Sequence, residues 1–371
     1  MNTESNVPSF SARMADILNG GALTAAIAIG YRTDLFEAMA AMEAPADSAA
    51  IALKAGLDER YVREWLGVMG TGGIVHMERD AVGGVLYQLP AHHAACLTRS
   101  AGSANLAVYC QEIPLLTRTV MEAVIDAFKS GDGVPYSRYT DFQAFMTELS
   151  NAKHRRVLVS DFLPSVDRGR LVERLESGIR VCDLGCGEGV SVHVMAKAFP
   201  NSRFIGVDVD PAAIAKARAG ALEMGIANAD FELQDAVVLG DLPRFQGTCD
   251  YIIALDAIHD QTAPLEALCS IRKMLAPAGI FSMIDIAAHS DPISNADHPM
   301  GAFLYTVSLM HCMPVGRVNG GLGLGMMWGR QQAVDLLEAA GFDQVEVSPF
   351  PNDDFNLHYQ CRLSPIGTGA S

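Results

Sequence analysis

A glycine turn between a buried strand and a helix places the strongest constraint on this chain. The segment Val181–Gly189 reads VCDLGCGEG, an apolar run with one carboxylate followed by three glycines at a spacing of two. Glycine lets the backbone pass close to a ligand because it has no Cβ. The helix predicted at 189–199 then directs its N-terminal amides toward that ligand.

A second predicted strand, 203–208, ends in the carboxylate of Asp208 about twenty residues after the first strand. A carboxylate at this point can accept hydrogen bonds from both hydroxyls of a ribose. Glycine turns of this kind serve both dinucleotides and S-adenosylmethionine, so these residues alone leave both ligands open.

Composition narrows the classes of partner. Half of the 371 residues are hydrophobic and the formal charge is −16, which disfavours phosphate backbones and anionic membrane surfaces. We therefore expect neither nucleic acid nor a membrane as partner. The apolar stretch Ala22–Ile29 is too short to span a bilayer, and eight cysteines without a CxxC pair predict free thiols in a reducing cytoplasm and no metal.

The pattern along the chain changes near residue 176. Before it, short helices at 46–55 and 58–70 precede an alternating hairpin at 74–77 and 85–89, which is typical of a winged helix. Further helices are predicted at 103–130 and 141–176. We expect residues 1–175 to form a mainly helical, winged-helix-like domain.

Strands and helices alternate in residues 176–371. Strands are predicted near 179–184, 203–208, 229–234, 250–255, 279–286, 343–349 and 357–363, with helices near 189–199, 211–224, 263–275 and 330–340. Such alternation predicts an α/β fold with a mostly parallel, seven-stranded sheet that is covered on both faces.

Five motifs in order make residues 178–363 resemble the class I S-adenosylmethionine-dependent methyltransferases. They are Val181–Gly189, Asp208, Gln234–Ala236, Tyr251–Asp256 and Leu275–Gly279. The resemblance implies S-adenosyl-L-methionine as cofactor, bound by Asp183, Gly185, Cys186, Gly187, Asp208, Val209, Asp235, Ala236 and Leu255. A helical winged half before this sheet is similar to the two-domain small-molecule enzymes, whose first domain forms a homodimer and helps to cover the substrate. The resemblance implies the same two roles for residues 1–175.

Dinucleotide binding is the alternative for the sheet. Such sites usually space their glycines G-x-G-x-x-G, whereas the third glycine here comes one residue early. The antiparallel strands expected after Phe342 also resemble the methyltransferase sheet more than the dehydrogenase sheet. The resemblance therefore implies a Rossmann-like seven-stranded sheet with an antiparallel last strand.

Three residues are candidates for catalysis. His259 and Asp260 follow the fourth strand, at the end of the sheet where ligands bind, and they resemble the histidine–aspartate pair of plant-type O-methyltransferases. A histidine suits proton removal at neutral pH. The alternative is that His259 only lines the pocket. His311, on a helix predicted at 299–312, is an acceptor-binding residue, a second base or a core histidine.

The candidate acceptor-binding residues are spread along the chain: Tyr136, Tyr139, Tyr305, Trp328 and His358. The glycine-rich stretch 319–329 is either a connector or a lid whose apolar side carries Trp328. His358 lies in the last predicted strand, where it serves the pocket or the core.

We expect methyl transfer to a small molecule (enzyme class 2.1.1), with oxygen as the acceptor because of His259. Transfer to a thiol or thioether, which needs no base, is the first alternative. The second is a cofactor-sensing transcriptional regulator. Against it, helix 58–70 carries Glu59 and Glu64 beside Arg60 and Arg63, and a DNA-reading helix usually has more positive charge.

Overall fold

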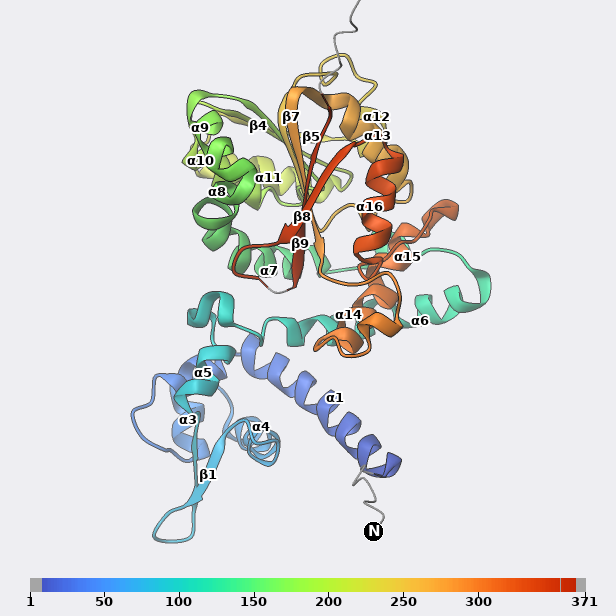
Figure 1. Cartoon of the computed structure of the whole chain (residues 1–371). Helices are drawn as coiled ribbons and strands as arrows, with labels where there is room; N and C mark the ends of the chain where they lie inside the picture. The colour runs from blue at the N-terminus through green and yellow to red at the C-terminus, as the bar shows by residue number, and fades with distance from the viewer. Residues whose placement is uncertain (1–8, 354, 365–371) are drawn as a thin grey trace, which may run out of the picture. The chain divides into compact units, whose positions relative to one another are not determined.

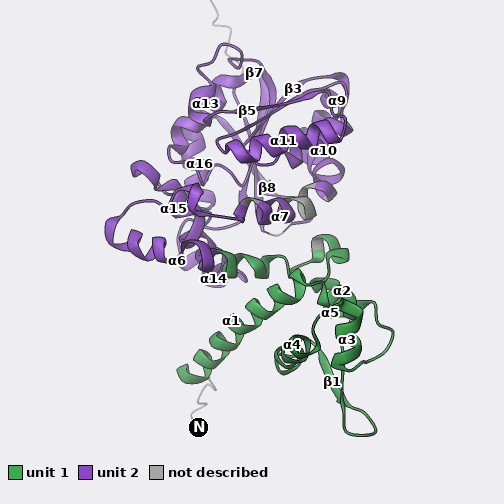
Figure 2. Ribbon diagram, turned by 180° about the vertical axis from the view of Figure 1, so that it is seen from behind, with its two compact units in different colours: residues 1–115 green, residues 116–371 purple. Residues whose placement is uncertain are grey.

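The computed structural model describes residues 9–353 and 355–364. It consists of two compact units, residues 1–115 and 116–371 (Figure 2). The boundary expected from the sequence pattern lies later, between 175 and 176, because the sheet begins there. In the structure the helices between 116 and 175 belong to the second unit.

The first unit contains the winged helix that the sequence predicts. Asp47 and Asp58 accept hydrogen bonds from backbone amides at the starts of the two central helices, as N-cap residues do. The hairpin pairs His76 with Gln88 in antiparallel register. The elements are α1 (Phe10–Arg32), α2 (Leu35–Ala40), α3 (Ser48–Ala55), α4 (Glu59–Thr71), β1 (His76–Arg79), β2 (Val85–Gln88), α5 (Ala91–Leu97), η1 (Arg99–Ala104) and η2 (Tyr109–Gln111).

Helix α1 exposes much of its apolar surface. Within the described residues it is the one helix that is long and apolar enough to cross a membrane, by length and composition only. Phe10, Met14, Ile17 and Leu18 follow helical spacing, and their exposed fractions are 76%, 39%, 49% and 69%. Such a stripe indicates a surface that another apolar surface covers.

The second unit is built on the predicted seven-stranded sheet, in the order β5-β4-β3-β6-β7-β9-β8 (Figure 1). Strands β3 to β7 run parallel, and β9 is antiparallel to both of its neighbours. The strands are β3 (Arg180–Leu184), β4 (Arg203–Asp208), β5 (Ala229–Leu233), β6 (Cys249–Leu255), β7 (Leu275–Ile286), β8 (Gln344–Pro349) and β9 (Asn356–Arg362).

Apolar layers cover both faces of this sheet, as its near-continuous apolar strands require. Alternate residues of β6 show the two layers: Tyr251 and Ile253 face one cluster, while Ile252 and Ala254 face the other. The first cluster includes α9 (Arg170–Ser177), α10 (Val190–Ala198) and α11 (Pro211–Glu223), and the second includes α12 (Ala236–Leu239), α13 (Pro264–Met274) and α16 (Gly329–Ala339).

The remaining helices precede the sheet or lie in the insertion after β7. Two of them, η4 and η7, are single π-helical turns, which are often found at functional sites. The full set of these remaining helices is α6 (Glu112–Ser130), η3 (Tyr136–Arg138), α7 (Phe142–Val157), η4 (Leu158–Phe162), α8 (Leu163–Ser165), η5 (Val166–Gly169), η6 (Ile293–Asn295), α14 (Gly301–Val307), η7 (Ser308–Cys312), α15 (Met313–Gly316) and η8 (Val318–Gly320).

Candidate functional site

The glycine turn connects β3 to α10 with its backbone folded back on β4. The amides of Gly185 and Cys186 both donate to the carbonyl of Val207, at 2.9 and 3.1 Å. Gly185 has φ +73° and Gly187 has φ +53°, a region that glycine adopts without strain. A Cβ on Gly187 would meet open space, whereas one on Gly185 would lie 2.5 Å from the Cβ of Ala257.

Asp208 is tied to this turn. Its Oδ2 accepts from the Gly187 amide at 2.8 Å and its Oδ1 from the Asp210 amide at 2.9 Å. Burial raises the pKa of Asp208. The next side chain, Val209, is apolar and 56% exposed. The structure thus brings Asp208 to the glycine turn and leaves an apolar surface beside it.

The other predicted cofactor residues lie at the same edge of the sheet or in the turn itself. Asp183 lies in β3, and its carboxylate accepts from the Ser191 hydroxyl; burial raises its pKa to about 7. Asp235 follows β5 and caps α12, accepting from the Val237 amide at 2.9 Å, and Ala236 begins that helix. Leu255 ends β6, and Cys186 is buried within the turn.

His259 is buried in the loop after β6 and pairs with a carboxylate of the next strand. Its Nδ1 lies 2.8 Å from Oδ1 of Asp285, which is fully buried in β7. Burial lowers the pKa of His259, but the carboxylates of Asp285 and Asp260 outweigh burial and raise the pKa well above its usual value. Asp285 therefore orients the ring and leaves Nε2 to face the site.

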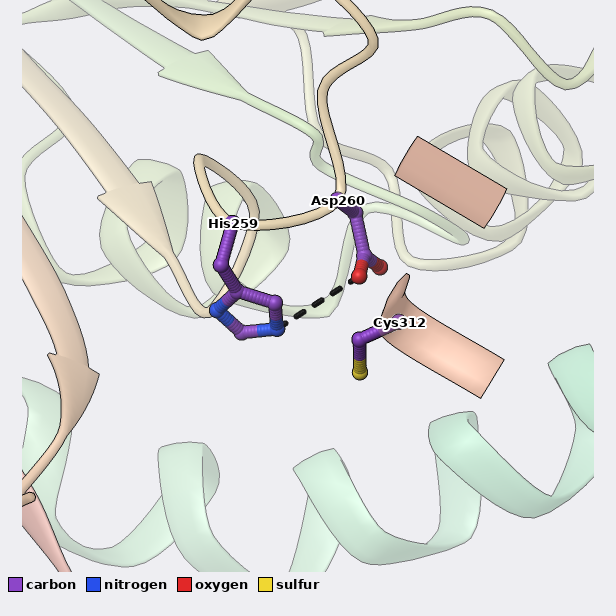
Figure 3. Close-up of side chains that lie close together, drawn as sticks. All are labelled: His259, Asp260 and Cys312. Carbon is purple, nitrogen blue, oxygen red and sulfur yellow. Dashed lines mark ion pairs between the residues drawn. The ribbon is translucent and has the colours of Figure 1, made fainter. Parts of the chain in front are cut away.

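Two residues lie beside Nε2 of His259. Oδ1 of Asp260 is 3.5 Å away, and His259, Asp260 and Cys312 each offer one ligand atom within 4.8 Å of the others (Figure 3). The second oxygen of Asp260, Oδ2, accepts from the Tyr136 hydroxyl at 2.8 Å. Burial and the carboxylate of Asp260 raise the pKa of Cys312 to about 12. The predicted catalytic residues His259 and Asp260 thus lie together.

His311 lies beside this group within a set of aromatic rings. Its imidazole stacks on Phe142 with ring centres 4.0 Å apart, and the ring of Tyr139 meets it edge-on at 4.9 Å. Burial lowers the pKa of His311 to about 4, so the ring is neutral. Its Nε2 is buried without a hydrogen-bond partner among the described residues. The hydroxyl of Tyr139 donates to the Met310 carbonyl at 3.0 Å.

The other three predicted acceptor-binding residues, Tyr305, Trp328 and His358, contact other parts of the protein. Tyr305 accepts from Asn295 at 3.1 Å and packs in a small cluster with Ile286 and Met327. Trp328 is buried in the core on the α13 face of the sheet. His358 is buried in β9, with Nε2 2.9 Å from the Ser282 hydroxyl, and burial lowers its pKa to about 4. None of these contacts joins them to His259.

Sequence reasoning missed Asp285, Cys312 and Phe142 as members of this site. Asp285 carried a usable signal, because a single carboxylate between Ile284 and Ile286 in a buried strand needs a partner. Cys312 and Phe142 carried none. They reach the site through contacts between segments that are far apart in the sequence.

Two family models match the chain. Residues 21–99 match the Rv2258c-like winged HTH domain, and residues 175–312 match a methyltransferase domain. Among curated proteins, the trans-aconitate 2-methyltransferase of Variovorax paradoxus is 30% identical over 157 residues, which are 35% of this chain and 56% of that protein. The chain spans about a quarter of the length of the cyanobacterial relatives that it matches.

Solved structures match over nearly the whole chain. Human N-acetylserotonin methyltransferase, in complex with S-adenosylmethionine, has a TM-score of 0.68 at 16% identity, covering 98% of this chain and 99% of that one. A putative O-methyltransferase from Nostoc punctiforme has a TM-score of 0.69 at 18% identity, covering 96% and 100%. The chain therefore combines a winged HTH domain with a methyltransferase domain, and it shares the two-domain fold of these solved structures.

Proposed function

We propose that the protein transfers the methyl group of S-adenosylmethionine to an oxygen atom of a small molecule, with His259 as general base. The observation that carries this proposal is the buried His259–Asp285 pair, 2.8 Å apart at the carboxyl end of the sheet. Solved structures of the same fold support it, since a putative O-methyltransferase from Nostoc punctiforme and the mitomycin 7-O-methyltransferase are among them.

The residues of the glycine turn fit this cofactor. A Cβ on Gly187 would meet open space, so the turn leaves room for the methionine end of the cofactor, and the carboxylate of Asp208 would accept from the ribose hydroxyls. The exposed Val209 offers an apolar surface to adenine, and Asp235 lies at the end of the adjacent strand. When bound, the cofactor supplies an electrophilic methyl group on a sulfonium.

His259 acts on the acceptor hydroxyl. Nε2 takes the hydroxyl proton as the oxygen attacks the methyl carbon, and the oxygen–carbon bond forms while the carbon–sulfur bond breaks. Asp285 accepts from Nδ1 throughout, so it fixes the tautomer and stabilises the imidazolium that forms. A thiol or thioether acceptor would have no need of this pair, which is why oxygen is preferred.

Aromatic rings and one neutral histidine offer a surface for the acceptor. Phe142 and Tyr139 hold the ring of His311, whose unpaired Nε2 is suited to a hydrogen bond with the acceptor. Tyr136 donates to Asp260 and so holds that carboxylate beside His259. We infer an acceptor with an apolar body and at least one further polar group.

The proposal is tested with two reciprocal variants. His259→Ala should lower kcat by roughly 10²-fold or more while calorimetry finds an unchanged Kd for S-adenosylmethionine. Asp208→Ala should abolish that binding. Acceptors are found by screening phenols, carboxylates, amines, thiols and thioethers for S-adenosylhomocysteine release. Undiminished turnover of His259→Ala would exclude His259 as the base, and undiminished binding by Asp208→Ala would remove the cofactor assignment.

A further inference from the structure

We propose that His259, Asp260 and Cys312 form a binding site for a thiophilic divalent cation of the Zn²⁺ type. The three side chains come from two segments, the loop after β6 and the π-helical turn η7, and converge on one point (Figure 3). They offer an imidazole nitrogen, a carboxylate oxygen and a thiol sulfur. This donor set suits zinc and cobalt, whereas oxygen ligands alone suit magnesium or calcium.

The separations fit a tetrahedral ion. Nitrogen and oxygen ligands about 2.0 Å from zinc lie roughly 3.3 Å apart at the tetrahedral angle. Nε2 of His259 and Oδ1 of Asp260 are 3.5 Å apart, and all three ligand atoms lie within 4.8 Å of one another. A zinc ion at this point would take Sγ of Cys312 at a bond length of about 2.3 Å.

Two further observations point to a ligand at this point. Oδ1 of Asp260 is buried, and its contact with Nε2 of His259 at 3.5 Å is an ion pair and not a hydrogen bond. This oxygen has no hydrogen-bond partner among the described residues, so a cation at this point would satisfy it. Nδ1 of His259 is held by the carboxylate of Asp285 at 2.8 Å. Metal-binding histidines are usually oriented in this way, by a carboxylate on the other ring nitrogen.

The thiol of Cys312 distinguishes this site from a simple acid–base pair. A general base needs no thiol beside it, whereas a thiolate ligand greatly favours zinc over hard cations. Binding replaces the thiol proton by the metal and releases that proton to the solvent. Three protein ligands leave a fourth position open, as in zinc sites that also take a water or a substrate.

The consequence for activity rests on the proposed function. A cation on Nε2 uses the lone pair with which His259 takes the acceptor proton, so metal binding and base catalysis exclude each other. We therefore expect Zn²⁺ at one equivalent to inhibit methyl transfer, and a chelator to restore it.

The metal site is tested directly, without turnover. Co²⁺ is titrated into the full-length protein, and absorption is followed for the thiolate charge-transfer band of a tetrahedral site. One equivalent should saturate the band. Cys312→Ser should abolish it, while the matched control Cys269→Ser, a half-buried thiol of α13, should keep it. Asp260→Ala should keep the band and weaken the Co²⁺ affinity at least tenfold.

A missing band, or one that survives Cys312→Ser, overturns the proposal. If Cys312→Ser does not fold, Asp260→Ala decides, because an unchanged Co²⁺ affinity there contradicts a three-ligand site. Failure of the methyltransferase proposal would look different. The band would still form and depend on Cys312, but no acceptor would yield S-adenosylhomocysteine.

Discussion

Asp285 determines what His259 can do. A buried imidazole by itself loses its charge, yet here two carboxylates hold the pKa above the ordinary histidine value of 6.5. Base catalysis needs the neutral ring. In a plot of kcat against pH, the acidic limb should therefore have its midpoint above pH 6.5. Activity should rise as pH rises through the raised pKa of His259.

Replacing Asp285 by asparagine moves this limb in a known direction. Asp285→Asn removes a negative charge at 2.8 Å, so the pKa of His259 falls and the acidic limb shifts to lower pH. We expect kcat at the pH optimum to fall roughly 10- to 100-fold, since the ring loses its orienting partner. A pH profile of kcat for both proteins measures the shift.

The control for that variant is Asp241→Asn. Asp241 is an exposed carboxylate that pairs with Lys273 and has no part in the proposed site. This variant should leave both the limb and kcat unchanged. A limb that stays in place in Asp285→Asn, or moves to higher pH, would contradict the role given to Asp285.

The residues of the site differ in how far they were predictable. His259 and Asp260 follow a strand end, so their position at the ligand-binding edge could be predicted from sequence. Asp285 was missed although the carboxyl ends of β6 and β7 are adjacent, because neighbouring strands in sequence are not always neighbours in a sheet. The position of Cys312 could not be predicted, because it depends on the path of the whole insertion after β7.

At the scale of elements, the turn from β3 to α10 depends on Gly185. An alanine there meets two costs, a positive φ of +73° and a Cβ only 2.5 Å from that of Ala257. Gly225 has a similar φ of +65° but open space around its Cβ position. The pair therefore separates backbone strain from crowding.

We expect Gly225→Ala to lower the free energy of unfolding by about 1 kcal/mol, the cost of a left-handed alanine. Gly185→Ala should lower it by roughly 2–4 kcal/mol, because overpacking adds to that strain. Urea denaturation of both variants and the wild type measures the difference. Equal losses would mean that crowding at Ala257 has no energetic weight.

The strands were predictable and the insertion was not. The inner strands β4, β6 and β7 are largely apolar runs, whereas β5 and β8 alternate polar and apolar residues, and every predicted strand overlaps an observed one. Residues 287–328 form short helices and a π-helical turn that pack on each other. Their apolar residues follow no single period, so local pattern could not resolve them.

At the scale of the molecule, the order of the elements predicted the fold, because alternating strands and helices have few ways to form a covered sheet. The sequence did not predict to which unit the helices between 116 and 175 belong. A helix shows an apolar face in its sequence, but the sequence does not say against which neighbour that face packs. In the structure these helices join the second unit.

The apolar stripe of α1 leads to our last prediction, that the protein is a homodimer through its N-terminal domain. Phe10, Met14, Ile17 and Leu18 are exposed along one face, and a second copy of this helix is a partner of matching chemistry. Sedimentation equilibrium should find a dimer for the wild type. The double variant Ile17→Glu/Leu18→Glu should be monomeric, since it buries charge in that contact.

Leu222→Glu is the matched control, because this leucine of α11 is 82% exposed and belongs to the second unit. It should remain dimeric. A monomeric wild type, or a dimer that survives the double variant, would exclude α1 as the contact. Since α1 also has the length and hydropathy of a membrane helix, the apolar stripe could be covered by a second copy of the chain or by a bilayer. Co-sedimentation with neutral vesicles distinguishes the two. A dimer contact predicts that the wild type stays in the supernatant, because pairing already covers the apolar side chains that a bilayer would otherwise take up.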